Sequence, residues 1–115
     1  MNVINYHTSG GKDVIDTYIQ KLPSKARVEA LETLSLLEDE GLDALELLNT
    51  RQLKSKVWEI KYAYKERMMY VVADEDNLYI LHACKKQKGK AERFELKKAY
   101  KRAKELGREL GKTFI

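Results

Sequence analysis

The stretch that decides the fold reads VWEIKYAYKERMMYVVADEDNLYILHAC and covers residues 57–84. Aromatic, β-branched and other apolar side chains fill most of it, in three runs that short polar segments separate. These runs are residues 57–64, 68–73 and 78–84. Short polar connections join neighbouring strands that run in opposite directions. The stretch therefore predicts three successive strands of an antiparallel sheet.

Two helices are predicted upstream of these strands. Apolar residues recur at helical spacing over residues 13–22 and again over 24–41, with a proline between them and Ser24 placed to cap the second helix. A short apolar run at residues 3–6 ends before a pair of glycines and predicts a first strand. Residues 42–53 are leucine-rich without a clean period, so we expect a packed connector there.

A third helix is predicted over residues 92–110. Its apolar residues share one face, lysines lie off that face, and Gly107 weakens its last turns. The order strand, two helices, three strands, helix predicts an α+β domain with an antiparallel-rich sheet and helices packed on one of its faces. A chain of 115 residues has the usual size of one domain, so we expect residues 1–115 to form a single unit.

Composition narrows the class of protein further. With 43% hydrophobic and 35% charged residues, the chain has enough apolar side chains to pack a core, which disfavours disorder. No segment approaches the roughly 20 apolar residues of a membrane-spanning helix. Cys84 alone cannot close an internal disulfide, which fits a reducing compartment. We therefore expect a cytoplasmic protein with no membrane partner.

Charge is distributed unevenly along the chain. Residues 1–50 hold four basic and nine acidic side chains, whereas residues 51–115 hold 18 basic and nine acidic ones. A basic half attracts polyanions, and a phosphate backbone is the commonest of these for a cytosolic domain. The alternative is a solvated lysine-rich helix with no partner. The charge pattern makes nucleic acid the first partner to test.

Two cations are candidates for a catalytic site. Lys61 lies late in the first predicted strand and Arg67 opens the next, so a hairpin would bring them together at one end of the sheet. A guanidinium holds a phosphate in bidentate fashion, and a lysine beside it can serve in proton transfer. The alternative is that Arg67 pairs with Glu59 or Glu66.

Aromatic side chains on the first strand of the meander are candidates for binding bases. Strand alternation places Trp58, Tyr62 and Tyr64 on one face. Exposed tyrosines beside cations can stack unpaired bases, at roughly 1 to 3 kcal/mol per base. The alternative, which we favour for Trp58, is that the rings pack beneath helices. For Tyr62 and Tyr64 both interpretations stay open.

A lysine-rich segment follows the last strand of the meander. Lys85, Lys86, Lys88 and Lys90 lie on a predicted loop that leads toward Arg93, and basic loops held by a rigid sheet often bind ligands. A generic basic patch has the same composition, so this segment alone has low specificity. We expect Lys85, Lys88, Lys90 and Arg93 to contact RNA, and Lys86 to belong to the catalytic set with Lys61, Arg67 and His82.

Histidine is a further candidate for proton transfer. His82 lies just before the lysine segment and could act as a general base near neutral pH. A packed, neutral imidazole is the commoner outcome on an apolar strand, and His7 is a weaker candidate still.

The acidic residues of the basic half do not have the spacing of a metal nuclease. Asp74, Glu75 and Asp76 sit together on a predicted turn, which disfavours hydrolysis by two metal ions. No glycine-rich phosphate loop or Ser-His-Asp signature is present either. Lysine, arginine, tyrosine and histidine suit RNA as substrate, because its own 2′-hydroxyl can attack the adjacent phosphate while cations stabilise the transition state. We therefore expect neither a metal ion nor another cofactor.

Several stretches together resemble the phage-derived, HigB-like branch of the RelE/ParE toxin superfamily. The similar segments are residues 11–23 with their Leu-Pro break, the Leu-rich helix end at 34–41, Val57-Trp58-Glu59-Ile60-Lys61, Arg67-Met68-Met69-Tyr70-Val71-Val72, Tyr79-Ile80-Leu81-His82-Ala83-Cys84-Lys85-Lys86, and Glu95-Leu96 with Ala99. The resemblance spans roughly residues 10–106. Two departures are Ala91-Glu92 in place of a Thr-Pro pair, and Ala83-Cys84 in place of a glycine and phenylalanine.

The resemblance implies a RelE-like fold and a toxin of a type II toxin-antitoxin system. Such a toxin is a ribosome-bound mRNA endonuclease that uses 2′-hydroxyl attack, without a metal, and leaves a 2′,3′-cyclic phosphate. By resemblance, Arg67 would clamp the scissile phosphate, Lys61 would support it, and Lys86 and Lys90 would stabilise charge or contact ribosomal RNA. The implied partner is a helix-turn-helix antitoxin, expected to form a heterotetramer with the toxin.

Two other classes of function remain open from the sequence. A ParE-like toxin of the same superfamily poisons DNA gyrase and leaves RNA intact. A non-enzymatic double-stranded-RNA-binding module also has three strands followed by a lysine-led helix. Its fold would leave the acidic N-terminal pair of helices unused.

Overall fold

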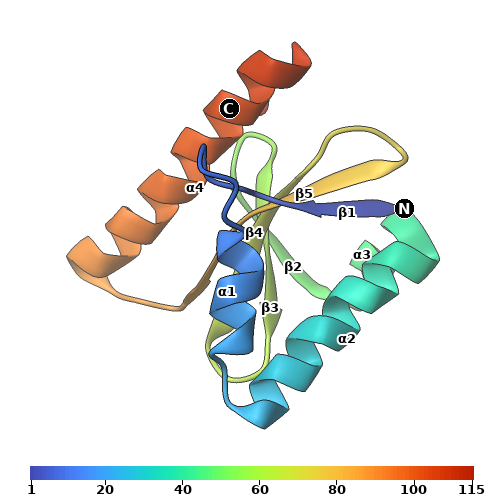
Figure 1. Cartoon of the computed structure of the whole chain (residues 1–115), viewed down its shortest axis with the longest axis vertical. Helices are drawn as coiled ribbons and strands as arrows, with labels where there is room; N and C mark the ends of the chain where they lie inside the picture. Colours follow the sequence, from blue (N-terminus) through green and yellow to red (C-terminus); the bar gives the residue numbers. More distant parts are fainter.

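The computed structural model describes residues 1–115 as three layers, with a central sheet between helices (Figure 1). In chain order the elements are β1 (Asn2–Asn5), α1 (Val14–Gln20), α2 (Ser24–Glu40), the 3-10 turn η1 (Gly41–Asp43), α3 (Ala44–Leu47), β2 (Asn49–Lys54), β3 (Val57–Tyr62), β4 (Glu66–Val72), β5 (Asn77–Lys85) and α4 (Gly89–Leu110). The α+β class and the antiparallel meander are confirmed, in a RelE-like arrangement. None of the helices combines the length and apolar character needed to cross a bilayer.

The sheet has the strand order β1-β5-β4-β3-β2. Neighbouring strands are antiparallel except β1, which runs parallel to β5 with Val3 opposite Leu78. The parallel pair is possible because α1 and α2 carry the chain back across the sheet between β1 and the meander. The N-terminal strand thus lies beside the last strand of the sheet.

The prediction of a packed connector over residues 42–53 was wrong for its second half. Residues Asn49–Lys54 form β2, an edge strand paired antiparallel with β3, with Arg51 opposite Glu59. Most residues of this strand are polar or charged, so the sequence shows no alternation that would predict a strand. Such residues are common on edge strands, where they discourage pairing with other chains. The first half packs as expected through Leu45 and Leu48.

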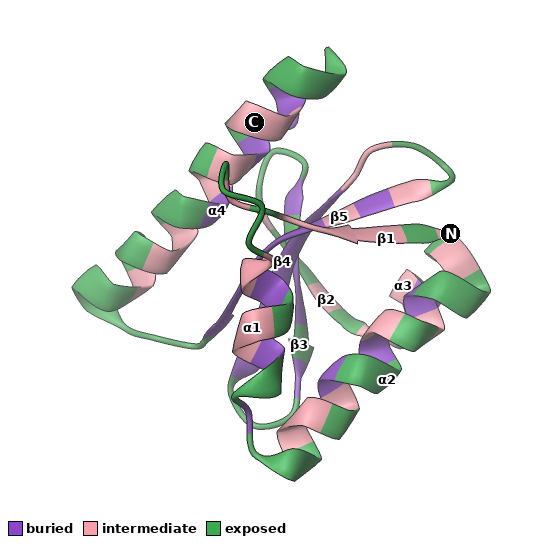
Figure 2. Cartoon of the chain, in the orientation of Figure 1, coloured by how far each residue is buried: buried purple, intermediate pink, exposed green.

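The expectation that all helices pack on one face of the sheet was also wrong. Along β4, Met68 and Tyr70 join a core beneath α1 and α2, whereas Met69 and Val71 face the opposite side, beneath α4. Figure 2 shows β4 buried between the two helical layers. A strand covered on both faces is apolar throughout, which explains the uninterrupted run from Met68.

The N-terminus of α1 has a side-chain cap, whereas the cap predicted for α2 is absent. Asp13 caps α1, since its carboxylate accepts hydrogen bonds from the N–H groups of Ile15 and Asp16 at 3.0 and 2.8 Å. Ser24 does not cap α2; it is the first helical residue, and Pro23 precedes it without a side-chain cap. Pro23 is the N-cap residue and has no side-chain oxygen that could accept from the first helical N–H groups.

A bulge in β5 turns two consecutive side chains toward α4. Met69 pairs with His82 and Tyr70 pairs with Ile80, so Leu81 is an extra residue in the ladder. A bulge of this kind interrupts the alternation of side chains between faces. Leu81 packs in the core beneath α4 and His82 bonds to α4, so both lie on that side of the sheet.

The last helix is longer than predicted, and its C-terminal end is closely packed. It begins at Gly89 rather than residue 92 and continues to Leu110. Gly107 is buried where the chain folds back, and a Cβ there would lie 2.5 Å from the carbonyl oxygen of Lys112. This close approach allows Phe114 to fill the core between α4 and the sheet. Gly107 thus serves packing of the tail rather than merely weakening the helix.

Candidate functional site

A basic hollow lies at the end of the sheet where β3 turns into β4. Its volume is about 280 Å³, and it is lined by Asn49, Lys61, Ala63, Lys65, Glu66, Arg67 and Lys86. Lys61 and Arg67 are directly opposite each other in the β3–β4 register, so the predicted proximity of these two cations is confirmed. We call this set of residues the basic hollow.

The rim of the basic hollow is a strained turn. Ala63 and Lys65 have φ angles of 48° and 64°, a left-handed region that costs residues with a Cβ about 1 kcal/mol or more. Tyr64 between them is 80% exposed, and the Lys65 ammonium lies 5.2 Å from its ring centre. The strained backbone therefore holds an aromatic ring and a cation in solvent beside Lys61, which is itself exposed.

Arg67 lies at the base of the basic hollow and is only 1% exposed. Its guanidinium donates to Glu59 at 3.0 Å and to Glu92, so of the pairings left open by the sequence, the one with Glu59 forms. Burial alone would lower the pKa of Arg67, but these charged acceptors outweigh it and raise the pKa above its usual value. Glu66 instead accepts a hydrogen bond from Tyr18 at 2.5 Å and forms an ion pair with Lys85 at 3.3 Å.

Charges alternate along a row beneath the start of α4. Arg51 pairs with Glu59 at 3.0 Å, Glu59 with Arg67, Arg67 with Glu92, and Glu92 with Lys86 at 3.3 Å. Partial burial opposes ionisation of Glu92, but the hydrogen bond from Arg67 outweighs it, so the pKa of Glu92 lies below its usual value. The row carries one more positive than negative charge and opens at Lys86 toward the basic hollow.

The lysine segment spans the junction of β5 and α4, and the predicted loop is only part of it. Lys85 ends β5, Lys86 and Lys88 lie between the two elements, and Lys90 belongs to α4. Lys85, Lys88, Lys90 and Arg93 are exposed, and the backbone N–H of Lys86 donates to the carbonyl of Lys65 at 2.7 Å. That hydrogen bond ties the segment to the strained turn. The structure therefore brings Lys86 to the basic hollow. Lys85 pairs with Glu66 of the hollow, whereas Lys88, Lys90 and Arg93 do not line it.

The two tyrosines proposed to stack bases differ in exposure. Tyr62 is 8% exposed and belongs to the core beneath α1 and α2, with its hydroxyl unpartnered. Its ring is therefore not a stacking surface in this structure, whereas Tyr64 is. Burial of Tyr62 follows from the register, which directs it toward the same face as Ile60.

His82 is buried and engaged at both ring nitrogens. Arg102 donates to Nδ1 at 3.0 Å, so Nδ1 must be unprotonated and Nε2 must carry the hydrogen that it donates to Glu95. Burial lowers the pKa of His82, with Arg102 and Lys98 adding to this and Glu95 opposing it. The residue is thus a neutral imidazole held between strand and helix, and it does not line the basic hollow.

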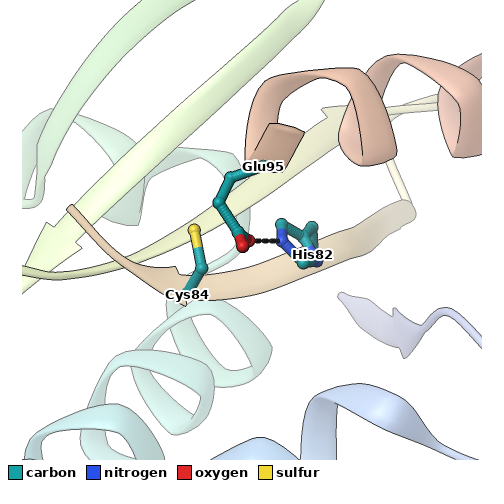
Figure 3. A group of neighbouring side chains, drawn as sticks. All are labelled: His82, Cys84 and Glu95. Atoms are coloured by element: carbon teal, nitrogen blue, oxygen red, sulfur yellow. Dashed lines mark hydrogen bonds and ion pairs between the residues drawn. The ribbon is translucent and has the colours of Figure 1, made fainter. Parts of the chain in front are cut away.

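His82, Cys84 and Glu95 place three metal-ligating atoms within 4.8 Å of one another (Figure 3). The donor set fits a metal ion poorly. A metal on Nε2 would displace the hydrogen that binds Glu95 and require one on Nδ1, where Arg102 already donates. Burial also raises the pKa of the Cys84 thiol to about 12, which disfavours the thiolate that a metal requires.

Two further surface hollows are lined mostly by residues that the sequence analysis did not assign to a site. One, of about 660 Å³ along α4, is lined by Lys54, Arg93, Leu96, Lys97, Tyr100, Lys101, Lys104 and Ile115. A larger one, of about 780 Å³ beside β2, is lined mostly by apolar side chains such as Trp58 and Tyr70 and holds few groups capable of chemistry. The spacing of Lys97 and Lys101, one turn apart, was the available signal for the first hollow. Glu92 was noted only as a departure from the family's Thr-Pro pair, and nothing in the sequence indicated a role for Arg51.

An N-terminal strand, two helices, four strands of a mostly antiparallel sheet and a C-terminal helix form a RelE-like arrangement. Residues 17–104 match the family model described as phage-derived protein Gp49-like (DUF891), so the chain belongs to this family, which is part of the RelE/HigB-like toxin superfamily. The match spans β2, β3, β4 and β5 and most of α4. No curated protein is significantly similar to the chain.

Proposed function

We propose that this protein is the toxin of a type II toxin-antitoxin system and cuts mRNA on the ribosome without a metal ion. The observation that carries the proposal is the basic hollow, in which Lys61, Lys86 and Arg67 converge beside the exposed Tyr64. A Gp49-like chain with this fold is consistent with a RelE/HigB-like toxin. The hollow supplies what RNA cleavage needs from a protein, namely fixed positive charge at the phosphate.

In the proposed reaction the RNA provides its own nucleophile. The 2′-oxygen attacks the neighbouring phosphorus, its proton leaves to a base, and the bond from phosphorus to the 5′-oxygen breaks as that oxygen takes up a proton. The products are a 2′,3′-cyclic phosphate and a 5′-hydroxyl. Lys61 and Lys86 face solvent in the hollow, so we assign them the stabilisation of charge on the phosphate oxygens.

The other predicted residues take roles that follow from their positions. Tyr64 stacks a base next to the cleaved linkage, and Lys85, Lys88, Lys90 and Arg93 contact the RNA backbone. Arg67 clamps the phosphate once its bond to Glu92 opens.

His82 and Tyr62 are buried, so in this proposal they support neighbouring elements and do not contact the RNA. His82 positions α4, because both of its nitrogens are occupied by α4 side chains. Tyr62 supports the hollow from within the core.

A toxin of this superfamily implies a cognate antitoxin. We propose a helix-turn-helix antitoxin that forms a heterotetramer with this chain and covers or distorts the basic hollow. The acidic N-terminal helices α1 and α2 are part of the main core through Ile15, Ile19 and Leu37. They are therefore not surplus, which argues against a simple double-stranded-RNA-binding module.

Brief induction followed by mapping of mRNA 5′ ends tests this proposal. We expect new ends in codon phase within translated messages, with cyclic phosphates on the upstream fragments. The variant Lys61→Ala/Lys86→Ala should lose this cleavage by at least about 100-fold, since each cation is expected to contribute about tenfold or more. The control Lys12→Ala/Lys25→Ala removes equal charge from exposed positions elsewhere and should cleave normally. Intact transcripts accompanied by DNA-damage signalling would instead identify a gyrase poison.

A further inference from the structure

Three donors converge on the carboxylate of Glu92. Arg67 Nη2 and the backbone N–H of Gln87, at 3.3 Å, donate to Oε1, and Lys86 Nζ lies 3.3 Å from Oε2. A guanidinium, an ammonium and a backbone N–H around one anion are the groups that proteins use to hold phosphate. We call Arg67, Lys86 and the Gln87 N–H the anion site.

The group that occupies the anion site belongs to the most displaceable part of α4. Glu92 is in the first turn of the helix, which starts at Gly89 with a φ angle of 60° and has no side-chain cap at Lys88. No residue from Gly89 to Arg93 belongs to a core cluster, and the first core contacts of α4 are made by Leu96 and Ala99. This turn can therefore open without disturbing the packing that holds the rest of the helix.

Without Glu92, the donors of the anion site would lack an acceptor. Glu59 satisfies only one terminal nitrogen of Arg67, and Arg67 Nε already lacks a partner although it is buried. Removing the Glu92 carboxylate would leave Nη2 without its acceptor as well, together with Lys86 and the Gln87 N–H. A buried cation with unpaired donors is costly, so the site needs an anion from some source.

We propose that the anion site is the seat of an RNA phosphodiester and that Glu92 is an internal occupant that the phosphate must displace. This inference rests on the proposed function and adds the control of its phosphate site. Both groups carry a single negative charge, so the exchange leaves the charge balance of the row from Arg51 to Lys86 unchanged. The internal carboxylate competes at a high effective concentration because it is tethered.

The competition predicts which RNA can enter. RNA free in solution must displace a tethered carboxylate and binds weakly. RNA held beside the protein by a larger assembly has a high effective concentration of its own and can win the exchange. Glu92 thus restricts cleavage to presented RNA, which fits action on the ribosome.

Binding of an uncleavable probe separates this proposal from a purely structural ion pair. The probe is a fluorescent single-stranded oligonucleotide with 2′-deoxy sugars, whose affinity is measured by anisotropy at fixed low salt. The variant Glu92→Gln removes the competing charge, and Glu109→Gln removes the same charge from an exposed position on the same helix. We expect Glu92→Gln to bind about tenfold tighter than wild type and Glu109→Gln to stay within about twofold.

Equal affinity of the two variants would overturn the proposal, because net charge alone would then explain the gain. If Glu92→Gln does not fold by circular dichroism, Glu92→Asp carries the test: it keeps the charge but withdraws it from Arg67, and unchanged probe affinity there would also overturn the site. Cleavage is scored separately on ribosome-bound mRNA, by mapping of 5′ ends after brief induction of each variant. Tighter binding with no cleavage by any variant would retain the anion site and reject the nuclease function.

Discussion

The two faces of the sheet are built from the same strands but differ in chemistry. On the face beneath α1 and α2, the core consists of apolar side chains such as Ile60 and Met68, with Glu66 as the buried carboxylate at the end of β4. On the face beneath α4, charged and polar groups are buried among the apolar ones, including Glu59, Arg67 and His82. Adjacent residues of β3 thus enter different environments. The first face is packed with apolar side chains, and the second holds fixed charge beside the basic hollow, where we propose that RNA binds.

Buried charge is an expensive way to fill a core. Each ion loses its hydration, and well-packed apolar residues are often as stabilising as a buried ion pair. The face beneath α4 therefore makes sense only if its charges serve a purpose beyond stability. The basic hollow supplies one, because Arg67 reaches it from beneath while Glu59 keeps the guanidinium fixed.

The largest expected effect is on the charged face. Glu59→Gln leaves Arg67 buried without its main counter-charge from the sheet, and we expect a loss of about 3 to 5 kcal/mol in the free energy of unfolding. Ile60→Val, the neighbouring residue on the apolar face, should cost only about 0.5 to 1.5 kcal/mol. Urea unfolding followed by circular dichroism measures both. Equal losses would show that the two faces do not differ in this way.

The partner of Glu59 at the surface gives the matching control. Arg51 pairs with the same carboxylate, but its side chain is 49% exposed, so Arg51→Gln should cost under about 1 kcal/mol. If Arg51→Gln lowers the free energy of unfolding as much as Glu59→Gln does, the loss in Glu59→Gln comes from its pair with Arg51 and not from the burial of Arg67.

The fit of α4 against its own tail gives an intermediate effect. Gly107→Ala puts a Cβ 2.5 Å from the Lys112 carbonyl oxygen, so the tail carrying Phe114 must shift. Overpacking of this kind costs about 1 to 3 kcal/mol. Gly10→Ala is the control, since the nearest atom to its Cβ is 3.9 Å away and it should be close to neutral. Thermal unfolding of the two variants is the measurement, and equal melting temperatures would show that the tail does not hold α4.

The sequence predicted features that depend on a short segment of chain better than features that depend on contacts between distant segments. The apolar runs in residues 57–84 carry their own periodicity, so the meander was predictable, and the β3–β4 hairpin brought Lys61 opposite Arg67 as expected. Strand β2 was missed because an edge strand is polar. The Arg67 to Glu92 contact was missed because it joins residues 25 positions apart in the chain, and only the packing of α4 over the sheet brings them together.

The smallest effect is the pH dependence of the charged face. The pKa of His82 in the folded chain lies below its usual value, so the unfolded chain binds more protons once the pH falls below about 6.5. Above that pH, titration of His82 does not change the free energy of unfolding. As the pH falls from there toward the folded pKa, the free energy of unfolding decreases, by at most about 1.4 kcal/mol per pH unit for one proton. His82→Gln should unfold with a flatter dependence between pH 7 and 5.5, in urea titrations compared with the exposed control His7→Gln. A His82→Gln profile as steep as that of wild type would mean that the charged face does not depend on a neutral imidazole, and that Arg102 and Glu95 hold α4 without it.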